Sequence, residues 1–409
     1  MTSLPSHTIV PTAVVFGRLT VGEKVIGAAV VTTSIMPDVP LCLASHGGDS
    51  QQTTMVFMAT DLSYADVLTR LLSRTDLSVS EATQVMAQIM AGELSDAQIA
   101  AFLVALRAKG ETVDEVVGFR AAILDNAVAL DIPSTVLDIV GTGGDPYGAV
   151  VNVSSIASIV AAGAGVPVVK HGNRAASSSS GASDLLGELG VNLELDPTQV
   201  KAVFDRVGLT FVFAAKFHPG FRHAAAARKD IGVPTVFNIL GPLCNPVRPE
   251  ASAVGVSSSE RVPQMAGVFR TRGATALLYR GDDGIDKMTT TGYSRVWEVT
   301  RGDVIEHVID VEELGLRKAS IDDLLGKDPA HNASLAKSVL SGEPGPVRDI
   351  VVLNTAAGLT SFDLSRDHKQ LDIPLKERLV ANIARAQETI DSGAAQRTLD
   401  AWVDASHSA

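Results

Sequence analysis

The chain has 409 residues, 46% of them hydrophobic and only 4% aromatic, which is typical of an α/β globular protein with two or three domains and argues against a fibrous or disordered chain. The formal net charge of −12 disfavours a general nucleic-acid surface, so a polyanionic ligand must be met by local cations, backbone N–H groups or a metal. The cysteines, Cys42 and Cys244, provide neither a disulfide framework nor a metal-ligand spacing, so we expect a reducing, cytoplasmic location.

Residues 1–57 precede the first regular helical pattern, and we interpret them as a disordered extension or as the product of a start codon placed too far upstream. Their apolar run at residues 25–36 is too short to cross a bilayer and ends at Pro37. A secretory signal peptide is the weaker interpretation, and Glu23 counts against it. We therefore expect no membrane association.

Residues 58–133 predict a small all-helical domain. Helical patterns cover residues 64–72, 79–91, 96–109 and 113–126, and three of them begin with a capping box, in which Ser or Thr is followed three positions later by Glu or Gln. Gly92 and Gly110 supply helix stops. Because no strand-like alternation comes before residue 135, we place the domain boundary near residues 131–134.

Residues 134–409 predict an α/β domain with a mainly parallel central sheet, because apolar runs alternate with helical patterns. Expected strands cover residues 135–140, 166–169, 191–195, 209–213, 252–256 and 274–279, and a late antiparallel pair covers residues 295–299 and 304–309. Expected helices cover residues 154–162, 182–189, a segment opened by Asp196 and Pro197, and residues 221–229, 261–270, 335–340, 350–357 and 375–390. Some of the later helices can pack on the helical domain. Ligands of such sheets bind at the carboxyl ends of the strands.

The turn at residues 141–145, Gly-Thr-Gly-Gly-Asp, follows the first expected strand of this domain and precedes a helix. Its glycines let backbone N–H groups approach an anion closely, and the dipole of the following helix adds attraction. Asp145 suits a cation or a ligand hydroxyl better than a phosphate, so the turn indicates a phosphorylated sugar accompanied by a metal ion. A purely structural glycine turn is an equal alternative.

Two further polar stretches lie at or just after expected strand ends. Asn-Val-Ser-Ser at residues 152–155 opens a helix, where its side chains either cap the helix or bind phosphate and magnesium. Lys-His-Gly-Asn-Arg at residues 170–174 leads into a serine-rich segment at 175–181. We interpret that segment as a ligand loop rather than a linker, because a strand and a helix hold its two ends.

Two more stretches follow later strands. In Phe-His-Pro-Gly-Phe-Arg at residues 217–222, followed by Arg228, one arginine can bind a carboxylate with two hydrogen bonds while the other is a solvated charge. Gly-Asp-Asp-Gly-Ile-Asp-Lys at residues 281–287 is an acidic loop suited to magnesium, although Asp-Asp-Gly is also an ordinary turn.

In this order the motifs resemble those of the anthranilate phosphoribosyltransferase family, together with Thr-Val-Phe-Asn-Ile-Leu-Gly-Pro-Leu at residues 235–243. Each motif is weak alone, but the ordered set across about residues 61–405 is highly specific. The resemblance implies a homodimer with the fold of class II nucleoside phosphorylases, in which the active site lies in a cleft between a helical and an α/β domain. It also implies Mg²⁺-dependent transfer of phosphoribose from phosphoribosyl pyrophosphate (PRPP) to the amine of anthranilate, in tryptophan biosynthesis.

The resemblance further implies roles for individual residues. PRPP would be bound by Gly141, Gly144, Asp145, Asn152, Val153, Ser154, Ser155, Lys170, His171, Gly172, Asn173, Arg174, Ala175, Ala176, Ser177 and Ser178. Anthranilate would be bound by Gly141, Asn173 and Arg228, and magnesium by Ser154 and Asp286 with Lys287 at a third ligand position. Asp145, Lys170 and Arg228 are the candidate catalytic residues. Because a neutral aromatic amine is already nucleophilic, the task is mainly positioning and stabilisation of the leaving pyrophosphate.

The chain departs from the family pattern at three places. The family usually has Asp-Glu where this chain has Asp286 and Lys287, a change of two charge units. The Lys287 ammonium either lies against the pyrophosphate and stands in for one magnesium ion, or points into the metal site and weakens magnesium binding. Pro146 and Val150 replace a usual Gly and Thr, and the segment from Asp145 to Asn152 is one position longer than usual, so the phosphate loop can be reshaped. The extension before residue 61 is foreign to the pattern.

Other functions stay open at this point. A pyrimidine nucleoside phosphorylase would share the architecture, but it usually has His-Ser where Ile139 and Val140 precede the glycine turn. A paralogue that uses another aromatic acceptor, or a catalytically weak PRPP-binding protein, is compatible with the same motifs. A nucleic-acid-binding protein would need a basic groove, which the acidic composition disfavours.

Overall fold

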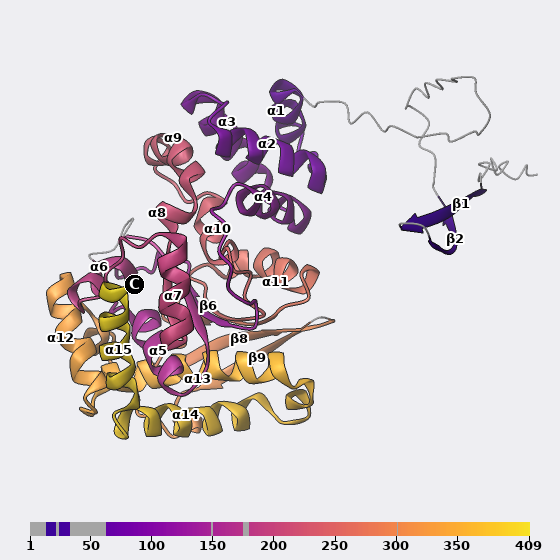
Figure 1. The fold of residues 1–409 in the computed structure, drawn as a ribbon. Coiled ribbons are helices and arrows are strands. Elements are labelled where there is room, and N and C mark those ends of the chain that lie inside the picture. Colours follow the sequence, from indigo (N-terminus) through magenta and orange to yellow (C-terminus); the bar gives the residue numbers. More distant parts are fainter. Residues whose placement is uncertain (1–13, 22–23, 33–62, 149, 175–179, 301) are drawn as a thin grey trace, which may run out of the picture. The chain divides into compact units, whose positions relative to one another are not determined.

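The computed structural model describes the chain except for residues 1–13, 22–23, 33–62, 149, 175–179 and 301, and it divides into two units, residues 1–61 and 62–409 (Figure 1). In the first unit, β1 (Val14–Val21) and β2 (Lys24–Thr32) pair in antiparallel register. The expectation of no strand before residue 135 is therefore wrong, because both segments are rich in Val, a residue that favours strands. The rest of the interpretation of residues 1–57 lies outside the described residues.

The second unit begins with four helices, α1 (Tyr64–Leu72), α2 (Val79–Ala91), α3 (Asp96–Lys109) and α4 (Val113–Asp125). All three predicted capping boxes are confirmed, at Ser78, Ser95 and Thr112, and Ser63 forms a fourth. Inside the group, Phe102 and Phe119 pack edge to face with ring centroids 5.9 Å apart. The helices thus bury an apolar core that continues into the α/β part, where it includes Leu240, Phe269 and Leu278.

A seven-stranded sheet with the order β5-β4-β3-β6-β7-β8-β9 forms the centre of the rest of the unit. The parallel strands are β3 (Leu137–Gly141), β4 (Val168–Gly172), β5 (Leu209–Phe213), β6 (Ala251–Gly255) and β7 (Thr275–Gly281). The antiparallel strands are β8 (Tyr293–Val299) and β9 (Val304–Asp310). The predicted mainly parallel sheet with a late antiparallel pair is confirmed. The carboxyl ends of β3, β4, β6 and β7 consequently lie along one edge.

Helices accompany this sheet throughout. They are α5 (Val153–Gly163), α6 (Ala182–Glu188), α7 (Pro197–Val207), α8 (Ala214–Phe217), α9 (Ala225–Ile231), α10 (Phe237–Leu243), α11 (Val262–Thr271), α12 (Pro329–Leu340), α13 (Pro346–Arg366), α14 (Leu375–Asp391) and α15 (Ala394–Ser408), with the 3₁₀ helix η1 (Pro219–Ala224) before α9. Gly358 of α13 lies so close to Ile139 of β3 that an added Cβ would crowd the Ile139 side chain. The 21-residue helix α13 therefore packs directly on the strand that leads into the glycine turn.

One predicted strand is wrong. Residues 191–195 have no strand partner and instead lie against α15, where the N–H of Asn192 donates to Ser406 Oγ at 2.9 Å and its side-chain amide donates to the Ser406 carbonyl at 3.2 Å. The apolar alternation of this segment comes from packing in the core beneath α15, a helix that we did not predict. The local pattern could not distinguish these two kinds of burial.

Polar and apolar contacts join the four-helix group to the α/β part of the same unit. Glu111, just before α4, forms a buried ion pair with Arg261, just before α11. Arg120 Nε of α4 donates to the carbonyl of Leu243 at the end of α10 at 2.7 Å.

Among the residues that the structure describes, no helix is both long and apolar enough to cross a membrane.

Candidate active site

Asp286 lies over the carboxyl ends of β3 and β6, which pair at Gly141 and Gly255. A Cβ at Gly141 would collide with the Asp286 carboxylate, and a Cβ at Gly255 would collide with the Asp286 backbone. Both positions therefore require glycine, because the loop after β7 passes directly over them. The Asp286 side chain is 3% exposed.

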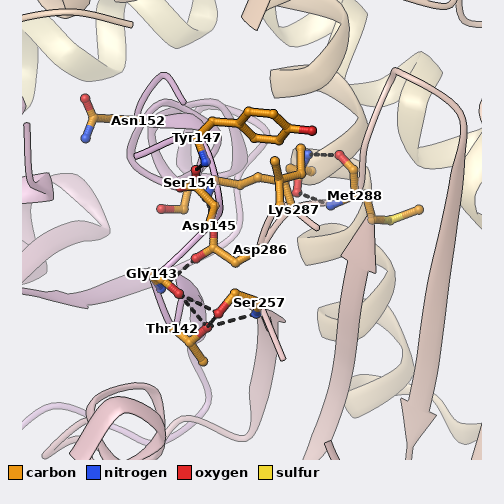
Figure 2. Close-up of polar contacts among 12 residues, drawn as sticks. Thr142, Gly143, Asp145, Tyr147, Asn152, Ser154, Ser257, Asp286, Lys287 and Met288 are labelled. Carbon is orange, nitrogen blue, oxygen red and sulfur yellow. Dashed lines mark hydrogen bonds and ion pairs between the residues drawn. The ribbon is translucent and has the colours of Figure 1, made fainter. Parts of the chain in front are cut away.

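The glycine turn after β3 wraps around this carboxylate. Gly143 and Gly144 have φ angles of +68° and +78°, which favour glycine, and the N–H of Gly143 donates to Asp286 Oδ2 at 2.7 Å (Figure 2). Asp145 Oδ1 accepts the N–H groups of Tyr147 at 3.0 Å and Gly148 at 2.8 Å, so this oxygen closes its own turn. The N–H groups of the turn thus bind carboxylates of the protein itself in this structure.

Lys170, near the end of β4, is 1% exposed and reaches across to β3 and α5. Its Nζ donates to the carbonyl of Ile139 at 2.7 Å and to Ser154 Oγ at 3.3 Å. Burial lowers the pKa of Lys170 to about 8, although attraction to the buried Asp138 opposes this change. The sequence motifs around Lys170 and Ser154 are therefore brought together.

The start of α5 presents the Asn-Val-Ser-Ser motif. Asn152 is the N-cap residue, but its side chain donates to the carbonyl of Ser180 at 2.9 Å and accepts from the amide of Asn332 at 2.9 Å, instead of capping the helix. Val153 is buried, and the buried Ser155 Oγ has no hydrogen-bond partner among the described residues. The N–H groups of Val153 and Ser155 donate to the carbonyls of Val151 and Asn152 at 2.6 and 3.1 Å, and the helix dipole at this end favours an anion.

His171 contributes to the structure more than to an open site. Its backbone N–H donates to Asp138 Oδ1 at 3.2 Å, and its Nδ1 lies 3.0 Å from the carbonyl of Gly241. The ring packs edge to face with His218 at 5.1 Å, and burial, followed by the neighbouring His218, lowers the pKa of His171 to about 3. Next along the chain, Gly172 leaves no room for a Cβ beside Phe211.

Three further residues that the resemblance assigns to PRPP or to anthranilate, Asn173, Arg174 and Arg228, are less buried. Asn173 is exposed, with its Oδ1 accepting the N–H of Arg174 at 2.9 Å, and the Arg174 guanidinium lies 5.7 Å from the centre of the Phe213 ring. The Arg228 guanidinium lies 5.0 Å from the centre of the Phe237 ring, and burial lowers its pKa. The predicted ligand residues Ala175, Ala176, Ser177 and Ser178 lie outside the described residues.

Two acidic side chains of the loop at residues 281–287, Asp283 and Asp286, have different partners. Asp283 accepts hydrogen bonds from Ile285 N–H, Thr289 Oγ1 and Thr291 Oγ1, so its carboxylate holds the loop together. Its Asp-Asp-Gly segment is therefore the ordinary turn that we considered as the alternative. Asp286 pairs with the ammonium of Lys287 through Oδ1.

The donor set provides no complete protein cage for a metal. Among the described residues no three His, Cys, Asp or Glu side chains gather to hold one. The partly exposed Ser154 hydroxyl is a suitable oxygen ligand for a magnesium ion that arrives on a phosphate, which is how proteins usually bind this ion with substrates.

Sequence reasoning missed two residues that hold these loops. Ser257 follows β6, donates from Oγ to the carbonyl of Gly143 at 2.7 Å, and contacts Thr142 Oγ1 at 3.3 Å. Asn332 of α12 binds Asn152, as described above. The position of Ser257 directly after an expected strand was a usable signal, whereas nothing local marks Asn332.

Comparisons with known proteins agree with this architecture. The helical bundle domain model of a glycosyl transferase family matches residues 65–127, and the a/b domain model of that family matches residues 133–396. Anthranilate phosphoribosyltransferase of Leifsonia xyli is 62% identical over 85% of this chain and 99% of its own length, and that of Streptomyces griseus is 50% identical over 88% and 98%. The chain belongs to the anthranilate phosphoribosyltransferase family.

Solved structures of the family have the same fold. The crystal structure of the enzyme from Thermus thermophilus is 38% identical, covers 84% of this chain and 99% of its own, and has a TM-score of 0.76. The structure of the Saccharomyces cerevisiae enzyme in complex with PRPP and Mg is 30% identical, covers 86% and 99% of the two chains, and has a TM-score of 0.74. The fold and family that the motifs predicted are confirmed.

Proposed function

We propose that the protein transfers phosphoribose from PRPP to the amine of anthranilate and releases pyrophosphate, as a step of L-tryptophan biosynthesis. The observation that carries this proposal is the meeting of the glycine turn, the Lys170 ammonium and the start of α5 at the carboxyl ends of β3 and β4. These groups favour a phosphorylated, anionic ligand. The names of relatives that are up to 62% identical support PRPP and anthranilate as the two substrates.

Lys170 is the residue best placed to assist departure of the pyrophosphate. Its ammonium is desolvated and held by the Ile139 carbonyl and the Ser154 hydroxyl, so it does not need to reorganise when negative charge develops nearby. Magnesium, when bound with PRPP, neutralises negative charge on the leaving group. Ser154 is the residue that we propose as its ligand, with phosphate oxygens completing the shell.

Arg228 is our candidate for the anthranilate carboxylate. Burial alone lowers its pKa, which fits a guanidinium that meets no carboxylate among the described residues. The guanidinium lies 5.0 Å from the centre of the Phe237 ring, and a guanidinium can bind a carboxylate through two parallel hydrogen bonds. Asn173 is proposed as the second polar contact of the acceptor.

The reaction can be tested through anthranilate fluorescence. Purified protein, PRPP and Mg²⁺ together should remove the anthranilate signal, whereas omission of any one should leave it. A flat signal, in a sample that binds PRPP in a separate titration, would contradict the proposed reaction. It would favour a paralogue with another acceptor or a PRPP-binding protein.

A homodimer is proposed as well, because the family resemblance implies one. Leu72 of α1 and Val104 of α3 are large apolar side chains that are 70% and 50% exposed, which supports a partner on the helical part of the chain. Light scattering coupled to size-exclusion chromatography should give twice the chain mass. A monomer mass at micromolar concentration would contradict this proposal.

A further inference from the structure

Lys287 occupies the cation position beside Asp286. Its ammonium pairs with Asp286 Oδ1, and the other carboxylate oxygen accepts the N–H of Gly143 at 2.7 Å (Figure 2). The Lys287 side chain is 12% exposed and that of Asp286 is 3% exposed, so the pair is largely shielded from water. Both oxygens of this carboxylate therefore already have positively polarised partners.

Lysine at position 287 makes the charge around the glycine turn less negative. Lys170 and Lys287 carry two positive charges, and Asp145, Asp286 and the buried Asp138, which attracts Lys170, carry three negative ones at neutral pH, so the sum is −1. Burial is the main cause of the lowered pKa of Lys170, and the charge of Lys287 lowers that pKa further. A carboxylate at position 287 would change the sum from −1 to −3, and this difference of two units is the charge that one divalent cation neutralises.

A metal ion at Asp286 does not fit this arrangement. Magnesium requires about six oxygen ligands, and it would have to displace the ammonium and approach a residue of like charge. The Lys287 ammonium, in contrast, binds the same carboxylate as the N–H of Gly143, so it lies at the glycine turn with its positive charge already in place. A phosphate that binds at the turn would meet this ammonium directly.

We propose that the Lys287 ammonium takes the place of a divalent cation at Asp286 and contacts the pyrophosphate group of bound PRPP. The protein then binds PRPP with one magnesium ion, held on the side of Ser154, and binds PRPP with measurable affinity when no divalent cation is present. This inference rests on the proposed function, since it assumes that PRPP is the ligand of the site.

The first test measures the dissociation constant of PRPP by isothermal titration calorimetry in EDTA. Lys287→Met removes the charge and keeps much of the side chain's volume. Lys201→Met is the matched control, because Lys201 also pairs with a nearby carboxylate, Asp205 at 2.7 Å, on the surface of α7. Lys287→Met should weaken metal-free binding about tenfold or more, as expected for loss of a charge-assisted hydrogen bond, and the control should be unchanged.

The second test counts metal ions with Mn²⁺ as the probe, by electron paramagnetic resonance of free Mn²⁺ in the presence of saturating PRPP. The unaltered protein should bind one Mn²⁺ per chain. Lys287→Glu should bind two, and its PRPP affinity should depend entirely on the metal. Circular dichroism melting of each variant establishes that it is folded. We expect the variants to fold, because each changes one side chain in a loop.

The outcomes separate the two proposals. Two Mn²⁺ per chain in the unaltered protein, no PRPP binding by it in EDTA, or equal metal-free binding by Lys287→Met would each overturn the role of Lys287 and leave the proposed reaction intact. Failure of the unaltered protein to bind PRPP even at saturating Mg²⁺ would overturn the proposed function itself, and this inference with it.

Discussion

Replacement of Lys170 by Met should make the protein more stable at neutral pH while it abolishes PRPP binding. Lys170 is 1% exposed, and burial lowers its pKa from the ordinary 10.5 to about 8. An unfolded chain holds this proton up to pH 10.5, whereas the folded chain releases it near pH 8. Between these values the unfolded state binds more protons, so the free energy of unfolding rises with pH.

The size of the effect follows from the same two values. The ammonium costs the folded state about 3 kcal/mol below pH 8, and this penalty falls to about 1 kcal/mol by pH 10. Met removes the penalty but also removes the hydrogen bonds to Ile139 and Ser154, at about 1 kcal/mol each. Lys170→Met should therefore be about 1 kcal/mol more stable than the unaltered protein at pH 7 and about 1 kcal/mol less stable at pH 10.

Urea unfolding at 25 °C, followed by circular dichroism at intervals from pH 7 to pH 10, measures this difference. All other lysines are common to both proteins, so their titration cancels. Burial raises the pKa of Asp138 to about 6 while the Lys170 charge lowers it, so the Asp138 pKa rises further in Lys170→Met, and the decisive comparison is the interval from pH 8 to pH 10. A stability difference that does not change between pH 8 and pH 10 would refute a buried, charged Lys170, whatever its value at pH 7.

Three further substitutions test the packing and the acceptor site. Gly255→Ala should destabilise the protein by about 1–3 kcal/mol and weaken PRPP binding, because its Cβ displaces Asp286; Gly187→Ala, at a helical glycine with open space, is the control in thermal unfolding. Arg228→Lys should raise the KM for anthranilate about tenfold and leave the PRPP dissociation constant unchanged. An unchanged KM for anthranilate in steady-state kinetics would contradict this role of Arg228. Arg261→Met should cost about 3–5 kcal/mol in urea unfolding, because it leaves the Glu111 carboxylate buried without its partner, and a loss below about 1 kcal/mol would contradict a buried pair.

The helical part of the fold was predictable because its signals are local. Each capping box joins residues three positions apart, so four consecutive residues are enough to predict the start of each of the helices α2, α3 and α4. The strand prediction for residues 191–195 was wrong because the signal that decides their structure is not local. Their partner is Ser406, more than 200 positions away, and no local pattern reports whether an apolar segment meets a strand or a helix.

The candidate site was predictable to the level of strand ends and no further. Because parallel strands place their carboxyl ends along one edge, the motifs at Gly141, Lys170 and Asp286 could be expected to gather. The partners within the site could not be derived in this way. That Asp145 closes its own turn, that Asp283 binds two threonines, and that Lys287 pairs with its neighbour each depend on side-chain directions that the spacing of the residues does not determine.

A balance between the stability of the empty site and its affinity for an anion explains why a chain with a net charge of −12 keeps two ammonium groups at this edge of the sheet. The buried Lys170 lowers the stability of the ligand-free protein, since the carbonyl and hydroxyl that hold it compensate only partly for lost water. A bound pyrophosphate would supply the missing negative charge and recover that energy as affinity, at a point where the departing group also gains charge. Instability in the empty site and stabilisation of the leaving group are therefore two consequences of one buried cation, and a variant that gains stability at Lys170 should lose catalysis for the same reason.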